Sequence, residues 1–135
     1  MPTEDELLND HIRCIYDPAK SADLANMGSN NFVGIVHSLL YEMSGKGPFR
    51  TEDMKLFMEF INSIGIEEII NIESQTIRGT FTGRYLRGND GKLSTGVARV
   101  ITKIYGETII LVINFTITVV DGKIDYIEHR IIASS

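Results

Sequence analysis

The sequence predicts an α+β fold, in which a helical first half is followed by an antiparallel sheet. Up to residue 63 the apolar side chains recur three and four residues apart, as on one face of a helix, whereas from residue 66 they alternate with a period of two, as in a strand. Asp121-Gly122 is a strong signal for a two-residue hairpin turn between two such strands. The chain has 135 residues, so we expect residues 1–135 to form a single domain.

The first helix is expected over residues 3–16. Thr3 and Glu6 have the spacing of a capping box at its start, and the apolar residues that follow recur at helical intervals. Asp17-Pro18 ends the helix, because the residue before a proline is disfavoured in the helical conformation. A second, shorter helix is expected over residues 21–27.

Residues 31–43 fit two interpretations. Their apolar side chains trace a helical stripe, and the glycine-containing segment 44–47 that follows is suited to end a helix. Val33, Ile35 and Val36 are β-branched, however, and the odd positions alternate as they would in a strand. The pattern by itself slightly favours the helix.

A further helix is expected over residues 52–63. Thr51 is the expected N-cap, and the acidic Glu52 and Asp53 in the first turn interact favourably with the helix dipole. The buried stripe of this helix is expected to consist of Met54, Phe57, Met58 and Ile61.

Four strands are expected in the second half, over residues 68–87, 92–105, 108–120 and 123–133. Asn89-Asp90-Gly91 is the expected turn of the first hairpin, Gly106-Glu107 that of the second and Asp121-Gly122 that of the third. The four strands would form an antiparallel meander.

The turns set which residues pair, and therefore which side chains share a face of the sheet. If Val120 pairs with Lys123, then Ile117 lies opposite Tyr126 and Phe115 lies opposite Glu128. One face is then almost wholly apolar, so it is expected to bear the helices.

Three glycines lie at or near one band of this apolar face, namely Gly79, Gly83 and Gly96. Glycine within a strand marks a bend or a close approach of two backbones. The band indicates either a sheet that curls around its helices or a concavity with room for a ligand, and the two interpretations are compatible.

The opposite face mixes polar and apolar residues. Arg99, Asn114 and His129 form one row across three strands, and the rows beside it are largely apolar. Such a surface is too apolar to be fully solvated and too polar for a core, and exposed patches of this kind mark association surfaces. We therefore expect a homodimer packed sheet to sheet through this outer face.

The order of the elements resembles the nuclear-transport-factor-2-like superfamily. Two segments carry the resemblance, Gly47-Pro48-Phe49-Arg50-Thr51-Glu52-Asp53 before the helix and Phe115-Thr116-Ile117-Thr118-Val119-Val120-Asp121-Gly122-Lys123-Ile124-Asp125-Tyr126-Ile127-Glu128 in the last hairpin. It implies a cystatin-like cone, in which a curved antiparallel sheet wraps around N-terminal helices and an apolar pocket opens at one end. It also implies that 31–43 is at least partly strand.

Members of this superfamily include ketosteroid isomerases, SnoaL-like polyketide cyclases, scytalone-type dehydratases, epoxide hydrolases and non-catalytic dimerisation modules, so fold alone does not decide the chemistry. Isomerase-like members place an acid just before the third helix, where the resemblance implies Glu42 with Tyr41 beside it. They place a second acid inward on the penultimate strand. This chain has Phe115 there, or Asn114 if the register slips by one, and neither can serve as that acid.

Tyr126, Glu128 and Arg130 are the polar residues expected on the apolar face. A buried carboxylate is costly unless it is paired, and Arg130 is two residues from Glu128. The two side chains are either an ion pair near the rim of the sheet or a pocket acid with its charged neighbour. A slip of the turn by one residue would replace all three with His129.

His37 and Tyr41 would be neighbours whether their segment is a helix or a strand. The candidate catalytic residues are therefore Glu128, Glu42 and His37. The candidate ligand-binding residues are Tyr41, Tyr85, Phe115, Tyr126 and Arg130.

Composition argues against several classes of protein. Lys and Arg total 13 and Asp and Glu total 18, so the formal net charge of −5 argues against binding to nucleic acid. The apolar stretch from Ile109 to Val120 is too short to cross a membrane as a helix. The single cysteine, Cys14, excludes an internal disulfide and indicates a reducing, cytoplasmic setting. No histidine pair has metal-ligand spacing and no phosphate-binding loop is present, so no metal or other cofactor is expected.

We therefore expect a pocket protein for a small apolar molecule that is polycyclic or resembles a polyketide or terpenoid. It would bind this molecule, and isomerise, cyclise or dehydrate it by acid–base chemistry without a cofactor. The alternative is a non-catalytic module for homodimerisation or partner binding, with an interior filled by its own side chains. A cavity of roughly a few hundred Å³ with convergent polar groups would distinguish the first from the second.

Overall fold

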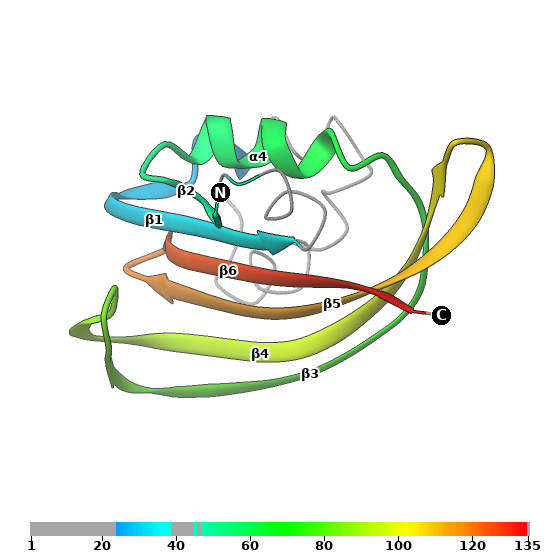
Figure 1. The fold of residues 1–135 in the computed structure, drawn as a ribbon. Coiled ribbons are helices and arrows are strands. Elements are labelled where there is room, and N and C mark those ends of the chain that lie inside the picture. The colour runs from blue at the N-terminus through cyan, green and yellow to red at the C-terminus, as the bar shows by residue number, and fades with distance from the viewer. Residues whose placement is uncertain (1–23, 39–44, 46, 135) are drawn as a thin grey trace.

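In the computed structural model the described residues are 24–38, 45 and 47–134. They form a six-stranded sheet with a helix across one of its faces (Figure 1). Across the sheet the strand order is β2-β1-β6-β5-β4-β3. The elements are β1 (Gly28–Ser38), β2 (Phe49–Thr51), α4 (Met54–Asn62), β3 (Ile66–Thr82), β4 (Arg87–Ile104), β5 (Glu107–Val120) and β6 (Lys123–Ser134).

The expected fold, a cone of antiparallel strands around N-terminal helices, is wrong. Where the structure describes the chain, it consists mostly of a mixed sheet with one short helix, and β1 runs parallel to β6. Residues 32–36 are buried one after another, which is typical of a strand that is covered on both faces and has a parallel neighbour. The helix expected over 3–16 lies outside the described residues. Of the one expected over 21–27 only residues 24–27 are described, and there the Met27 N–H donates to the Leu24 carbonyl oxygen over 2.9 Å.

Residues 31–38 belong to β1, so the strand interpretation of this segment is right there and the helical one is wrong. Residues 39–43 lie outside the described part of the chain. Gly34 shows how closely this strand meets the helix, because a Cβ at that position would overlap the ring of Phe57 in α4. The missing side chain lets Phe57 pack directly on the backbone of β1.

Helix α4 is confirmed in position but differs at its start. Asp53, and not Thr51, is the N-cap: its carboxylate accepts hydrogen bonds from the N–H groups of Lys55 and Leu56. Thr51 instead accepts a bond from the Asp53 N–H over 3.0 Å. The buried residues are those expected, Met54, Phe57, Met58 and Ile61.

The antiparallel meander of β3, β4, β5 and β6 is also confirmed. Asp121-Gly122 forms the last turn, with φ of 51° and 72° at the two residues. The preceding turn is Tyr105-Gly106, one residue earlier than expected, again with positive φ at both positions. Both turns have the mirror-image geometry that matches the twist of a hairpin.

The turn of the first hairpin, between β3 and β4, lies at a different position from the one expected. Asn89-Asp90-Gly91 is not a turn but part of β4, where Gly91 pairs with Gly79. A side chain at Gly91 would overlap the carbonyl oxygen of Val119, so this glycine serves close backbone approach. The chain turns instead at residues 83–86, which we call the β3–β4 connection.

A β-bulge in the last hairpin reverses the predicted faces of β6. Val119 pairs with Ile124 as expected, but the register then shifts and Thr118 pairs with Tyr126, which leaves Asp125 as the extra residue. The Asp125 carboxylate accepts a hydrogen bond from the Ser29 hydroxyl over 2.7 Å, which ties the bulge to β1. Consequently Phe115 pairs with His129, and the expected pairing of Phe115 with Glu128 is wrong.

The two faces of the sheet therefore differ from those expected along β6. The face toward α4, which we call the helix face, carries Ile127, His129 and Ile131, and His129 meets the Phe57 ring edge-on at 5.7 Å. The opposite face, which we call the outer face, carries Tyr126, Glu128 and Arg130. The buried core of the helix face includes Phe32, Val36, Ala98, Val100, Ile113, Phe115, Ile117 and Ile127.

Candidate functional site

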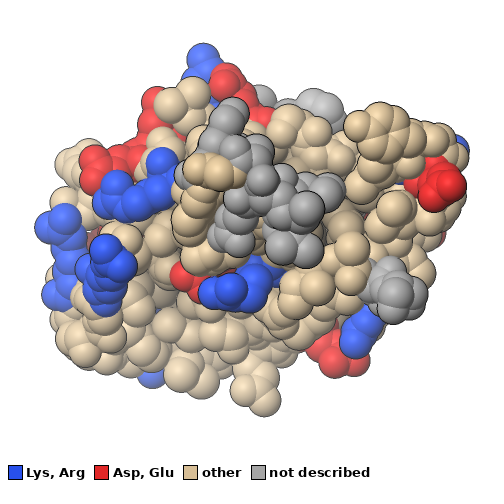
Figure 2. Space-filling model, viewed as in Figure 1, with Lys and Arg blue, Asp and Glu red and all other residues tan. Residues whose placement is uncertain are grey.

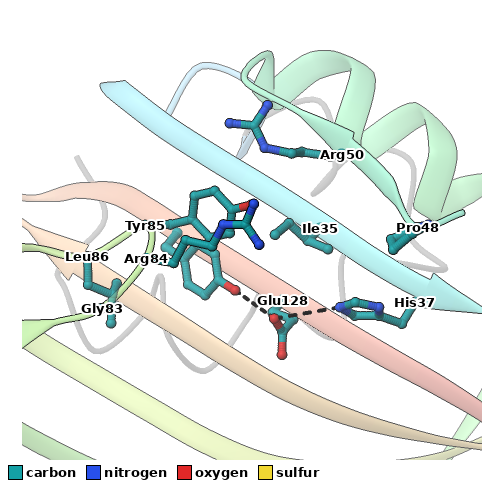
Figure 3. A pocket seen from close by; sticks show the side chains of 10 residues that line it. Ile35, His37, Pro48, Arg50, Gly83, Arg84, Tyr85, Leu86 and Glu128 are labelled. Atoms are coloured by element: carbon teal, nitrogen blue, oxygen red, sulfur yellow. Dashed lines mark hydrogen bonds and ion pairs between the residues drawn. The ribbon is translucent and has the colours of Figure 1, made fainter.

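A cavity of about 530 Å³ lies on the outer face, over β1 and β6. The β3–β4 connection and the start of β2 form its other walls (Figure 3). It is lined by Ile35, His37, Pro48, Arg50, Gly83, Arg84, Tyr85, Leu86, Tyr126 and Glu128. We expected a pocket between the sheet and its helices, whereas this cavity is on the side of the sheet away from α4.

The parallel pairing of β1 and β6 brings the polar residues of the cavity together. Ile35 pairs with Glu128, and Val33 pairs with Tyr126, so the outer sides of the two strands form one continuous surface. His37 follows Ile35 two residues later on the same side of β1. A histidine and a carboxylate that are 91 positions apart in the chain thus become neighbours.

Glu128 is the centre of a small polar cluster. The Tyr126 hydroxyl donates a hydrogen bond to Glu128 Oε2 over 2.7 Å, and His37 Nε2 lies 3.8 Å from the same oxygen. Figure 3 shows the His37 and Glu128 side chains pointing toward each other from β1 and β6. The His37 and Glu128 side chains are 22% and 34% exposed, so both are within reach of a bound molecule. Both of these contacts are made to the same carboxylate oxygen, Oε2.

Burial raises the pKa of the Tyr126 hydroxyl well above the usual value for tyrosine, and the hydrogen bond to Glu128 and the nearby Glu128 charge add to this shift. Tyr85 raises the pKa further, as a second acidic group beside the first. Tyr126 therefore remains protonated, as a hydrogen-bond donor, throughout the physiological pH range.

Aromatic rings and arginines close the other side of the cavity. Tyr85 of the β3–β4 connection stacks on Tyr126 with 5.9 Å between ring centroids and 17° between ring planes. The guanidinium groups of Arg50 and Arg84 lie 5.3 and 5.4 Å from the centroid of the Tyr85 ring. The same tyrosines pack with Val33 and Ile35 of β1, so the connection is held against the outer face.

The structure brings together four of the residues expected at the site, His37, Tyr85, Tyr126 and Glu128. Phe115 does not line the cavity, because it is buried in the core on the helix face. Arg130 is on the outer face but exposed and outside the lining, so the expected pairing of Arg130 with Glu128 is replaced by the contacts of Glu128 with Tyr126 and His37. The remaining two, Tyr41 and Glu42, lie outside the described residues.

Sequence reasoning missed five lining residues, Ile35, Pro48, Arg50, Arg84 and Leu86; the sixth, Gly83, was expected only as part of a glycine band that leaves room for a ligand. The alternation of Val33, Ile35 and His37 was a usable signal, since a strand would place all three on one side. Arg50 and Arg84 gave no signal, because isolated arginines are ordinarily solvated surface residues.

Within the described residues no group of three His, Cys, Asp or Glu side chains is arranged to hold a metal ion. No helix in the described part of the chain is both long enough and apolar enough to cross a membrane.

No protein-family model matches this chain, and no curated protein matches it. Among solved structures, a chain described as "An enumerative algorithm for de novo design of proteins with diverse pocket structures" is similar in fold, with a TM-score of 0.50 and 14% sequence identity. The likeness covers 90% of this chain and 99% of that chain. At this identity it concerns the fold alone, and membership of the nuclear-transport-factor-2-like superfamily remains a prediction.

Proposed function

We propose that the protein binds a small, largely apolar molecule in the outer-face cavity and transforms it by acid–base chemistry without a cofactor. The observation that carries this proposal is the convergence of Tyr126, Glu128 and His37 on a cavity of about 530 Å³. Ligand sites commonly have this size and combine apolar walls with a few convergent polar groups. Polycyclic, polyketide-like and terpenoid-like compounds fit its aromatic and aliphatic lining.

In this proposal Glu128 is the general base. Its carboxylate takes a proton from a carbon of the bound molecule beside a carbonyl group, and the same carboxyl group returns the proton at another carbon, which gives an isomer. Protonated Tyr126 orients the carboxylate through its hydrogen bond. In a dehydration, Glu128 would take a proton from the carbon next to the one that bears the hydroxyl group, and His37 would donate a proton to that hydroxyl group, so that water departs and a carbon–carbon double bond forms.

Membership of the nuclear-transport-factor-2-like superfamily and a reducing, cytoplasmic setting belong to the same proposal. The first is supported by the residue pattern of the last hairpin, and the second by the single cysteine, Cys14.

The proposal is tested with the substitution Glu128→Gln. Glutamine keeps an oxygen that can accept the Tyr126 hydrogen bond but cannot act as a base, so we expect turnover to fall by at least about a hundredfold while the melting temperature stays within a few degrees. A compound that co-purifies with the protein, found by native mass spectrometry, is the substrate to assay. Glu73→Gln, on exposed β3, is the matched control and should leave turnover unchanged.

Two outcomes would contradict the proposal. Full turnover in the Glu128→Gln variant would remove the general base. A large loss of stability with unchanged binding would mean that Glu128 serves mainly to hold β1 and β6 together.

The second candidate function is homodimerisation through the outer face. Ile77, Ile110 and Ile132 on this face are 56%, 40% and 48% exposed, which is unusual for large apolar side chains. Glu73 and Arg130 lie in one cross-strand row with Val97 and Asn114 between them. A two-fold axis along the strands, between β4 and β5, would therefore place each against the other in a second copy. Sedimentation equilibrium at micromolar concentration decides this candidate, because a monomer there would exclude it.

A further inference from the structure

Two arginines from different elements reach the outer-face cavity. Arg50 is on β2, and Arg84 is on the β3–β4 connection. Both guanidinium groups are held at similar distances from the Tyr85 ring, 5.3 and 5.4 Å from its centroid. A ring that stacks two cations restricts where they can point, and so positions them in advance for a ligand.

The charges that line the cavity are positive in sum, although the whole chain is acidic. Arg50 and Arg84 contribute two positive charges and Glu128 one negative charge, so the lining carries +1 with His37 neutral, against −5 for the protein. Arg50 also meets Glu52 at 3.3 Å, but both side chains are well exposed, and such pairs stabilise little. Arg84 has no ion pair among the described residues; its described contact is with Tyr85.

The positive and negative groups of the cavity come from different elements, Arg50 from β2, Arg84 from the β3–β4 connection and Glu128 from β6. Figure 3 shows Arg84 beside Tyr85, and Glu128 facing His37. Figure 2 shows Lys and Arg side chains gathered at the left-hand end of the molecule, the end at which Figure 1 places the β3–β4 connection. A small adjoining depression shares Leu86 with the cavity, and its charged lining residues are Arg87, Lys92 and Asp125, so its charge is also positive in sum.

We infer that the ligand of this cavity is an amphipathic organic acid, with an apolar body and one anionic group. The apolar body would lie against Ile35, Leu86 and the stacked tyrosines, and Arg50 and Arg84 would bind the anionic group through charge-assisted hydrogen bonds. Glu128 has the same charge as the anion and would repel it, so the carboxylate stays free for proton transfer. This inference rests on the proposed function and specifies the chemical class of its ligand.

Two fluorescent probes with the same ring system test the inference. The probe 1-anilinonaphthalene-8-sulfonate carries one negative charge, whereas N-phenyl-1-naphthylamine lacks the sulfonate and is neutral. In the double variant Arg50→Gln/Arg84→Gln we expect the affinity for the sulfonate probe to fall by about tenfold and the affinity for the neutral probe to change by less than about twofold. The variant Arg78→Gln/Arg99→Gln removes the same net charge at exposed positions outside the cavity and should leave both affinities unchanged.

A third variant shows where the probes bind. Ile35→Trp fills part of the cavity and should weaken both probes together, with circular dichroism confirming that the variants fold. If Ile35→Trp weakens both probes but the cavity arginines do not discriminate between them, the cavity binds ligands and only the anionic class is wrong. If neither probe responds to Ile35→Trp, the cavity is not a binding site for such molecules, which contradicts the inference and the proposed function together.

Discussion

The two faces of β6 show how one strand serves stability and a candidate site at once. Toward the helix face, Ile124 and Ile127 are completely buried, and His129 is enclosed against Phe57. Toward the outer face, Tyr126 and Glu128 line a cavity and bond to each other. The helix face is filled by close-packed apolar side chains, whereas the outer face keeps polar groups where a ligand can reach them.

The bulge at Asp125 separates these roles. Without the extra residue, Tyr126 and Glu128 would turn into the apolar core, where an ionised carboxylate is very costly. With it, the core receives Ile127 and Ile131 instead. A single inserted residue next to a hairpin turn thus decides which alternate side chains of β6 pack in the core and which ones face the cavity.

The largest effect is expected from truncation on the helix face. Phe57 is completely buried between Phe32 and His129, so Phe57→Ala should lower the free energy of unfolding by about 3 to 5 kcal/mol. Ile132→Ala on the outer face removes an exposed side chain and should change it by less than about 0.5 kcal/mol. Urea denaturation of both variants measures the contrast, and comparable losses would mean that the outer face is buried in solution.

An intermediate effect is expected at the bulge. Asp125→Ala removes the acceptor of the Ser29 hydroxyl, and hydrogen bonds to charged groups contribute about 1.5 to 3 kcal/mol. A double-mutant cycle with Ser29→Ala should give a coupling energy of about 1 to 2 kcal/mol between the two residues. A coupling near zero would show that the bulge is held by its backbone pairing alone.

The smallest effect concerns the alkaline pH dependence of stability. Because the pKa of Tyr126 is raised in the folded protein, the unfolded chain loses this proton at lower pH than the folded one. The contribution of Tyr126 to stability is complete below the ordinary tyrosine pKa of about 10 and is lost as pH rises above it. Tyr126→Phe should therefore make stability fall less steeply above about pH 10, as measured by denaturation at a series of pH values; identical profiles would contradict the raised pKa.

Local patterns predicted the elements that depend on local chemistry. The stripe of Met54, Phe57 and Ile61 predicted α4, and Asp121-Gly122 predicted the last turn, because both signals are contained within a few neighbouring residues. The parallel pairing of β1 with β6 has no such signal. It arises from the match between two distant apolar segments, which no spacing along the chain reveals.

Two further errors have identifiable physical causes. Asn89-Asp90-Gly91 has the composition of a turn, but Gly91 is required for its close approach to the Val119 carbonyl group, so the first hairpin turns elsewhere. The bulge was missed because Asp125 continues the alternation of polar and apolar residues as an ordinary strand residue would.

The site was predicted in part. Tyr126 and Glu128 were predicted as site residues because they are polar residues within an apolar pattern. The bulge shifts both of them to the outer face, so they remain neighbours there. His37 joined them through the parallel pairing with β6. Arg50 and Arg84 were not predicted, since only the folded position of the β3–β4 connection brings them to the same tyrosine ring.

The bond between Ser29 and Asp125 joins residues 96 positions apart, and its consequence lies in the order of folding events. Closing so long a loop costs conformational entropy before its contacts form, which makes the meeting of β1 and β6 a slow step. The two walls of the cavity exist only after that step. A molecule that contacts both Ile35 and Tyr126 would add its binding free energy to the state in which β1 and β6 are paired. A ligand added during refolding would therefore bind only the chains in which the two strands have met, and would stabilise them.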